Sequence, residues 1–257
     1  MFLGSQAPVG DNGTVNLNDK RVVILGGTSG IGLAVARLAL DQGASIVVAS
    51  NRHEAVGRAR ADLSRKAPSQ TRVEQLDVTN EEAVKRFFTT VEPFDHLIYT
   101  SGEDLPLGPL ASTNLALARG RFEVRYWGAV AAVKYGVGSI RQGGSIVLTS
   151  GFSATRPRPG WTSQASIQSA IEGLTRALAL ELAPIRVNCV SPGLSATPRW
   201  NAMTPAVREA LFAREENRVP LGRVGTADDI AAAYIYLMDN DFATGNVISV
   251  DGGGALV

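Results

Sequence analysis

The feature that most constrains the fold of this chain is the run of strand, glycine turn and helix between Val22 and Leu40. Val22 to Leu25 are apolar and mostly β-branched, as in a buried strand, and Leu33 to Leu40 favour a helix. The glycines between them leave room for a pyrophosphate against the backbone, where a Cβ would block it. The helix start adds N–H groups and a positive dipole end. This unit predicts a dinucleotide-binding turn that contains Gly26, Thr28, Ser29, Gly30, Ile31 and Gly32.

Strand-like and helix-like segments alternate along the rest of the chain. Six further apolar runs are typical of strands, at residues 45–49, 71–76, 96–99, 144–149, 185–190 and 246–250. Helical patterns cover 53–66, a segment that starts near Thr79, Leu115 to Ile140, and Ala165 to Leu182. This rhythm predicts an α/β protein, a three-layer Rossmann fold with a seven-stranded, parallel, doubly wound sheet. We expect a single domain over residues 19–257, after a flexible tail over residues 1–18.

Composition argues against several classes of function. Lys and Arg number 25 against 24 Asp and Glu in 257 residues, a balance that gives no basic surface for nucleic acid or membrane. No apolar run reaches the roughly 18 residues of a membrane span, and the first residues lack the pattern of a secretory signal. The single cysteine, Cys189, fits a reducing compartment. We expect a cytoplasmic protein with a small-molecule substrate, no metal site, and neither nucleic-acid nor membrane partners.

Five further motifs follow the glycine turn. They are Leu76-Asp77-Val78, Gly173-Leu174-Thr175-Arg176, Ile185-Arg186-Val187-Asn188, Ser191-Pro192-Gly193 and Val250-Asp251-Gly252-Gly253. In this order and spacing, the blocks resemble the short-chain dehydrogenase/reductase family over nearly the whole chain. The resemblance implies a nicotinamide cofactor, with Asp77 and Val78 beside the adenine. It also implies that the nicotinamide end is closed by Pro192, Gly193, Leu194 and Thr197.

The end of the second strand indicates which nicotinamide cofactor is used. Enzymes that prefer NAD usually carry an acid there, which binds the ribose hydroxyls and would repel a 2′-phosphate. This chain has Ser50, Asn51 and Arg52 instead, and an arginine can pair with a phosphate through two N–H groups. The alternative is that Arg52 is a solvated residue at a helix start. The sequence favours NADP(H).

The family pattern is lost at the catalytic positions. Family members place a Ser after the fifth strand, a Tyr-x-x-x-Lys on the next helix and a supporting Asn, which together hold and protonate a carbonyl oxygen. Aligned on the motif at residues 173–176, the Tyr and Lys positions fall on Gln164 and Gln168. The Ser position falls on Gly151, beside Ser150, and the Asn position on Arg125. With two residues of the cleft mouth added, the candidate catalytic residues are Glu103, Arg125, Ser150, Trp161, Gln164 and Gln168. A glutamine amide donates no proton near neutral pH, so the sequence predicts that the usual proton relay is absent.

The fourth and fifth strands end in polar residues that we expect at the cleft. Thr100, Ser101 and Gly102 should line the cofactor ribose, with Thr149 also among the cofactor-binding residues, and Glu103 should lean toward the substrate. The loop at residues 155–161 contains Arg156, Arg158 and Trp161. One interpretation is an ion pair between Glu103 and one of the arginines Arg125, Arg156 and Arg158. Another is a rebuilt active site in which Glu103 handles protons or a cation and Trp161 stacks on it, and a third is a solvated loop.

Three functions fit a retained cofactor site without the relay. The first is an NADP(H)-dependent oxidoreductase that reduces an imine or iminium, because hydride addition to an iminium gives a neutral amine and leaves no alkoxide to protonate. The resemblance extends to reductases and cyclising enzymes of fungal alkaloid pathways that keep NADPH without the relay. The second is a cyclase or isomerase whose cleft only shapes the substrate, and the third a non-catalytic NADP-binding sensor or partner subunit. If ordinary ketones are reduced, Tyr126 and Tyr99 are the first candidates for the proton donor.

The helical segments at residues 115–140 and 165–182 also bear on assembly. Both are rich in apolar residues around their circumference, more than one sheet face would cover. The family resemblance implies that such helices pack against a second copy, and that residues 247–257 form another interface. We therefore expect a homodimer or homotetramer.

Overall fold

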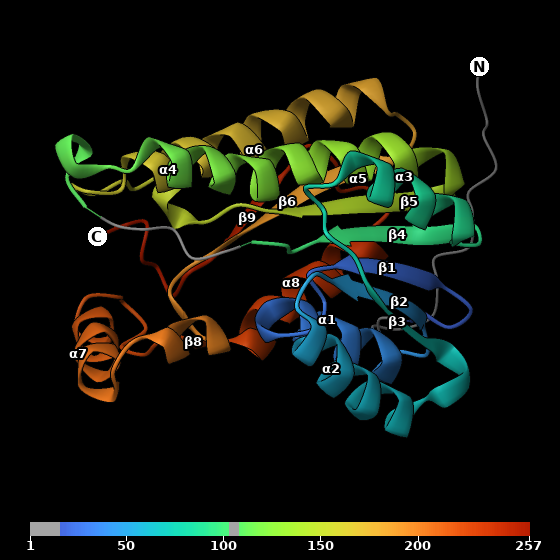
Figure 1. Cartoon of the computed structure of the whole chain (residues 1–257), viewed down its shortest axis with the longest axis horizontal. Helices are drawn as coiled ribbons and strands as arrows, with labels where there is room; N and C mark the ends of the chain where they lie inside the picture. Colours follow the sequence, from blue (N-terminus) through green and yellow to red (C-terminus); the bar gives the residue numbers. More distant parts are fainter. Residues whose placement is uncertain (1–15, 103–107) are drawn as a thin grey trace, which may run out of the picture.

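A seven-stranded parallel sheet forms the middle layer of the molecule (Figure 1). The computed structural model of the chain describes residues 16–102 and 108–257. Neighbouring strands follow the order β3-β2-β1-β4-β5-β6-β9, and each pair is parallel. The strands are β1 (Arg21–Leu25), β2 (Ser45–Ser50), β3 (Thr71–Gln75), β4 (Phe94–Tyr99), β5 (Ile140–Thr149), β6 (Arg186–Pro192) and β9 (Val247–Val250). From β1 the strand order runs outward to β3 on one side, and from β4 it runs outward to β9 on the other side. The crevice at the carboxyl ends of β1 and β4, where the order reverses, is where such sheets bind ligands.

Helices cover both faces of this sheet and bury one apolar cluster on each side. One layer contains α1 (Gly30–Asp41), α2 (His53–Lys66) and α8 (Ala227–Asp239); the other contains α3 (Glu81–Thr90), α4 (Leu115–Phe122), α5 (Gly128–Gly136) and α6 (Thr162–Glu181). Central strands such as β6 are buried along their whole length, as the continuous apolar runs predicted. The predicted three-layer Rossmann fold in a single domain is confirmed.

Several boundaries differ from the sequence prediction. The helix predicted over 115–140 is interrupted by one π-helical turn at Glu123–Trp127 and gives way after Gly136 to a short 3₁₀ turn. Strand β5 begins at Ile140, four residues earlier than the expected 144. At the amino end, Leu17 is buried against the core and its N–H bonds Gln42 O at 3.0 Å, so the packed chain already includes this residue of the predicted tail.

Elements between β6 and β9 extend the end of the molecule where the crevice opens. After β6 the chain forms β7 (Ser195–Ala196), α7 (Pro205–Glu216) and β8 (Gly225–Thr226), and β7 pairs with β8. Figure 1 shows α7, α4 and the C-terminus at the same end of the molecule. The sequence analysis assigned no element to α7, whose polar surface gives a weak periodic signal.

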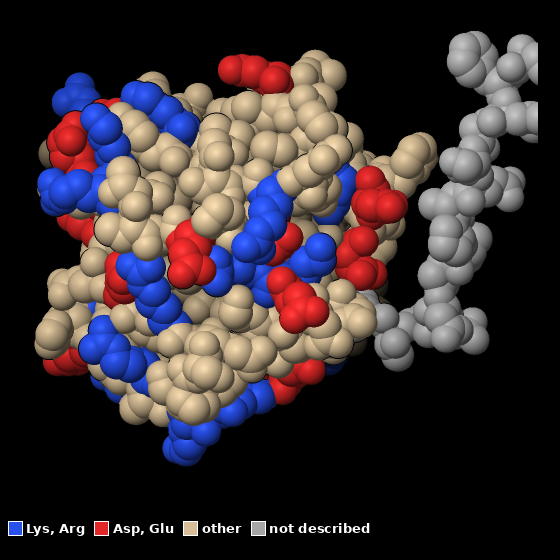
Figure 2. Space-filling model, turned by 90° about the vertical axis from the view of Figure 1, so that its right-hand side faces the viewer, with Lys and Arg blue, Asp and Glu red and all other residues tan. Residues whose placement is uncertain are grey.

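The opposite end, seen in Figure 2, has basic and acidic side chains interspersed over its surface. This view shows no extended area of a single charge, in line with the balanced composition. None of the helices in residues 16–102 and 108–257 has the length and apolarity to cross a bilayer.

Candidate functional site

The glycine turn packs directly on the segment that follows β4. Gly26 has a φ of +90°, and a Cβ there would lie 2.5 Å from the Ser101 backbone nitrogen. A Cβ on Gly32 would lie 2.4 Å from both Gly26 O and Thr100 Oγ1. Two glycines are therefore required by close approach, and the predicted residues of the turn and of the β4 end share the crevice between β1 and β4.

The first turn of α1 is approached by the loop that follows β6. Ser29, at the N-cap of α1, makes no side-chain capping bond, and Thr28 is buried. The Cβ of Thr197 would lie 3.5 Å from a Cβ on Gly30. The loop expected to close over the nicotinamide end therefore packs against the phosphate turn. Thr197 and Gly30, both predicted cofactor-binding residues, lie close together although they are far apart in the sequence.

Arg52 reaches across to the same turn from the end of β2. Its Nη2 donates to Ser29 Oγ at 3.0 Å, and its backbone N–H contacts Ser50 Oγ at 3.5 Å. Asn51 is exposed, and its carbonyl accepts a bond from Gln75. An arginine beside the phosphate turn is well placed for a 2′-phosphate, because guanidinium and phosphate form charge-assisted hydrogen bonds.

The expected adenine-flanking and nicotinamide-closing residues sit at the ends of β3 and β6. Asp77 Oδ1 accepts bonds from the Thr79 N–H at 2.9 Å and its hydroxyl at 2.7 Å, while Val78 is buried beside Gly128 of α5. Pro192 ends β6, and Leu194 is half-buried in the loop that follows. A Cβ on Gly193 would meet Asp251 Cα at 2.6 Å, so this loop is fixed against the segment that follows β9.

The Thr149 hydroxyl is hydrogen-bonded within the protein, and its place among the cofactor-binding residues stays a prediction. Its Oγ1 lies 2.6 Å from both the Tyr99 carbonyl and the Tyr234 hydroxyl, so it joins β4, β5 and α8. Tyr99 is buried as well and donates its hydroxyl to Val124 O. Burial raises the pKa of Tyr99 far above its usual range, which removes it as a candidate proton donor. Tyr126 is half-buried and packs edge-on against Phe122 and Trp127.

Two of the candidate catalytic residues, Ser150 after β5 and Gln168 on α6, are buried in the protein interior. Ser150 is buried, and its hydroxyl donates to Glu172 Oε1 at 3.1 Å. Gln168 is also buried and accepts a hydrogen bond from the Ser153 hydroxyl. A Cβ on Gly151 would lie 2.5 Å from Gln168 Nε2. Ser150 and Gln168 therefore support the β5–α6 junction, which argues against the catalytic roles expected of them, while Gln164 is half-buried one helical turn earlier.

Arg125 lies in the π-helical turn at the crevice. A Cβ on Gly102 would come within 2.6 Å of Arg125 Cζ, so the guanidinium lies directly over the backbone at the end of β4. The absence of a side chain at Gly102 makes this approach feasible. π-Turns inside helices often occur at functional positions, and here one brings a cation to the carboxyl edge of the sheet.

The arginine loop contacts α7. Arg158 lies over the Trp161 ring with Cζ 4.9 Å from the centroid, and its Nη2 is 3.9 Å from Glu215 Oε2. Arg156 is exposed. Glu103, the predicted partner, lies outside the described residues. The loop itself adjoins the segment that follows β4, because the Gly108 N–H bonds Gly160 O at 3.0 Å.

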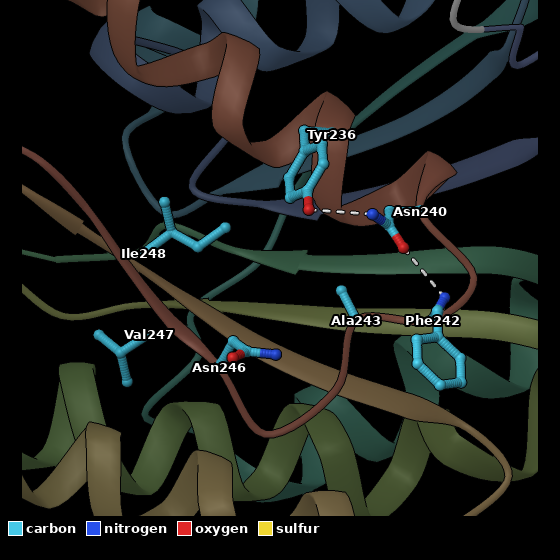
Figure 3. A pocket seen from close by; sticks show the side chains of 7 residues that line it. All are labelled: Tyr236, Asn240, Phe242, Ala243, Asn246, Val247 and Ile248. Atoms are coloured by element: carbon cyan, nitrogen blue, oxygen red, sulfur yellow. Dashed lines mark hydrogen bonds between the residues drawn. The ribbon is translucent and has the colours of Figure 1, made fainter.

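A pocket of about 330 Å³ lies elsewhere, at the edge of the sheet beside β9 (Figure 3). It is lined by residues of α8, the α8–β9 connection and β9, among them Tyr236, Asn240 and Phe242. The Asn240 side chain bonds the Tyr236 hydroxyl and the Phe242 N–H, as the dashed lines show. None of the predicted site residues lines this pocket, so we do not assign the cofactor to it.

Comparison with known proteins identifies the family. Residues 26–254 match the family described as enoyl-(acyl carrier protein) reductase. Short-chain dehydrogenase/reductase ATR9 of Stachybotrys chlorohalonatus is 32% identical over 93% of this chain and 98% of its own length. This chain belongs to the short-chain dehydrogenase/reductase family. A small-chain dehydrogenase solved in complex with NADPH is similar with a TM-score of 0.80 and 37% identity, over 93% of this chain and 99% of that one. The MalC reductase/Diels-Alderase of Malbranchea aurantiaca has a TM-score of 0.86 and 28% identity, over 94% and 98%.

The short-chain dehydrogenase/reductase motifs gave no sign of an ion cluster behind the arginine loop. Glu215 of α7 is buried and accepts bonds from Arg218 Nε at 3.0 Å and Nη2 at 2.5 Å. Arg218 also donates to the carbonyls of Gly254 and Val257. In the sequence, these residues belong to a charged run that is indistinguishable from a solvated helix face. Only the packing of α7 against the loop and the C-terminal segment reveals them.

Proposed function

We propose that this chain is an NADP(H)-dependent oxidoreductase that reduces an imine or iminium in an active site without the usual proton relay. Support for the cofactor comes from Arg52 beside Ser29 at the phosphate turn and from the relative solved with NADPH. The glycine turn supplies the close approach that a pyrophosphate needs. We also propose a reducing, cytoplasmic location, because the sequence has a single cysteine, Cys189, and it is buried as a free thiol.

The observation that carries the reaction is the position of Gln168. In the family, the corresponding lysine lowers the pKa of the proton-donating tyrosine. Here an uncharged amide is buried against Gly151 and held by Ser153, and Gln164 replaces the tyrosine. A carbonyl substrate would become an alkoxide with no acid beside it, whereas an iminium accepts hydride and becomes a neutral amine. The site therefore favours a C=N substrate over a C=O substrate.

Arg125, Trp161 and Glu103 are the proposed substrate-side residues. Arg125 lies over Gly102, where the cofactor cleft meets the substrate side, and Trp161 offers an aromatic face beside Phe152. We propose that Glu103 holds the positive charge of the substrate. Glu103→Gln should then lower turnover of a cationic substrate while NADPH affinity stays unchanged.

Steady-state assays test the reaction. Cofactor affinity is measured first by titration with NADPH and NADH, and oxidation of NADPH is then followed with a cyclic imine, 1-methyl-3,4-dihydroisoquinoline, and with acetophenone. We expect the imine to be consumed and the ketone to be a poor substrate. Ketone reduction at rates of about 1 to 1000 per second would refute the absence of a proton relay.

A matched variant restores the relay. Gly151→Ser, Gln164→Tyr and Gln168→Lys together replace the three family positions, and the side chain at 168 must shift to admit a Cβ at 151. We expect some ketone reduction in this triple variant. Its NADPH affinity serves as the control for correct folding.

The similarity to the MalC reductase/Diels-Alderase favours a second candidate, a cyclising activity in the same cleft. A cleft that shapes a reactive substrate can lower the entropic part of a barrier without hydride transfer. Product formation without oxidation of NADPH would identify this activity. If the cofactor binds and none of the substrates reacts, the chain is a non-catalytic NADP-binding protein.

A further inference from the structure

Arg158 is held in place by stacking on two aromatic rings. Its guanidinium lies over Trp161 at 4.9 Å and over Phe152 at 5.8 Å, measured from Cζ to the ring centroids. Stacking uses the flat face of a guanidinium and leaves the N–H groups in its plane available. Among the described residues, the Arg158 side chain donates no hydrogen bond: its nearest acid, Glu215, is 3.9 Å away, too far for one.

Glu215 is already neutralised by a different arginine. Arg218 donates two hydrogen bonds to its carboxylate, at 3.0 and 2.5 Å. The Glu215 side chain is only 6% exposed. Bidentate pairing of an arginine with a carboxylate is the strong form of this interaction. The group formed by Arg158, Glu215 and Arg218 therefore carries one surplus positive charge, and that charge resides on Arg158.

The surroundings of Arg158 favour an anion. Burial lowers the pKa of its guanidinium, and the nearby cations Arg218, Arg214 and Arg156 lower it further, against an opposing effect of Glu215. A guanidinium stays protonated at neutral pH in any case. Its side chain is 23% exposed, so a ligand can reach it while solvent screens it only in part.

The position of this cluster places it on the substrate side of the cleft. The Arg158 loop adjoins the segment that follows β4 through the bond between Gly108 and Gly160. Trp161 immediately precedes α6, which carries Gln164 one turn later. Helix α7, which carries Glu215, belongs to the connection between β6 and β9. Ligands of such sheets bind among the connections that follow the strands.

We propose that Arg158 is a substrate-binding residue that takes a carboxylate of a planar, aromatic substrate lying against Trp161. The carboxylate would accept two hydrogen bonds from the guanidinium edge while the ring contacts the partly exposed Trp161 side chain. This proposal rests on the proposed function for the reaction itself and adds the class of substrate, an aromatic acid. It requires no turnover to test.

Isothermal titration calorimetry on the NADPH-bound protein tests it with a matched pair of probes, indole-3-acetate and indole-3-acetamide. They share the aromatic ring and differ in charge. We expect the acid to bind about tenfold more tightly, as charge-assisted hydrogen bonds predict. Arg158→Gln should abolish the preference, and Arg158→Lys should keep part of it. Arg156→Gln, an exposed neighbour on the same loop, should leave it unchanged.

Three results would overturn the proposal. They are equal affinities for the two probes, an unaltered preference in Arg158→Gln, and no detectable binding of the acid at millimolar concentration. NADPH affinity of each variant reports that the fold and cofactor site are intact. Failure of the proposed function is a separate result: imines would then not be reduced, while the acid preference and its loss in Arg158→Gln would stand.

Discussion

Acidification should destabilise the fold through one buried histidine. His96 lies in β4 with 3% of its surface exposed, and its Nδ1 is 2.9 Å from Ser145 Oγ of β5. Burial lowers the pKa of His96 from 6.5 to about 4; Asp95 opposes this shift, and Arg186 and Lys20 lower the pKa by smaller amounts. The folded protein therefore keeps this side chain neutral at pH values where the unfolded chain is already protonated.

The sign and size of the effect follow from proton linkage. Between pH 6.5 and about 4 the unfolded state binds more protons than the folded state, so the free energy of unfolding falls as the pH falls through this window. At about 1.4 kcal/mol per pH unit, the full effect of the shift from 6.5 to about 4 is about 3.5 kcal/mol. About 2.5 kcal/mol of this is lost between pH ~7.5 and ~4.5, a substantial part of the stability of an ordinary domain.

Urea unfolding followed by far-ultraviolet circular dichroism, at constant protein concentration across this pH range, measures the effect. His96→Asn should flatten the dependence by about 2.5 kcal/mol relative to the unaltered chain, whatever its effect at neutral pH. The other histidine, His53, is exposed, and His53→Asn should leave the dependence unchanged. An identical dependence in His96→Asn and the unaltered chain would refute the assignment.

Three further predictions concern the cofactor, the β5–α6 junction and the assembly. Arg52→Asp should narrow or reverse a preference for NADPH over NADH of at least about tenfold, since a charged hydrogen bond contributes about 1.5–3 kcal/mol. Arg58→Asp on the helix that Arg52 precedes, where Arg58 pairs with Glu54, is the control in these fluorescence titrations, and equal affinities in the unaltered protein would contradict the prediction. Gly151→Ser alone should destabilise the protein by about 1–3 kcal/mol by overpacking; an added Gln168→Ala should recover most of this in thermal unfolding, and simple additivity would argue against their contact. Light scattering at micromolar concentration should give a dimer or tetramer because α4 buries none of its residues, and a monomer mass would exclude this.

The fold could be predicted from the sequence because its signals are local. The β-branched run before Gly26 and the Rossmann rhythm of strands and helices depend on neighbours a few residues apart, and parallel strands buried on both faces read as unbroken apolar runs. The glycine positions could be recognised from the strand, turn and helix around them, although the backbone that a Cβ at Gly26 would meet belongs to Ser101, far along the chain. The family and its cofactor type follow from the same motifs. Boundaries such as the start of β5 were less certain, because Ile140 joins the sheet only by pairing with Phe94.

Only the tertiary structure decided which polar residues are available for chemistry. Thr149 looked like a cofactor ligand, but its hydroxyl is bonded to Tyr234, 85 residues away. Ser150 looked like a catalytic hydroxyl, but it bonds a glutamate of α6. Arg158, one of three arginines considered as a partner of Glu103, lies beside Glu215, a residue of a helix that the sequence did not reveal. A side chain's partners depend on distances across the fold rather than along the chain, so local pattern can specify where a strand ends but not which group its last residue will meet.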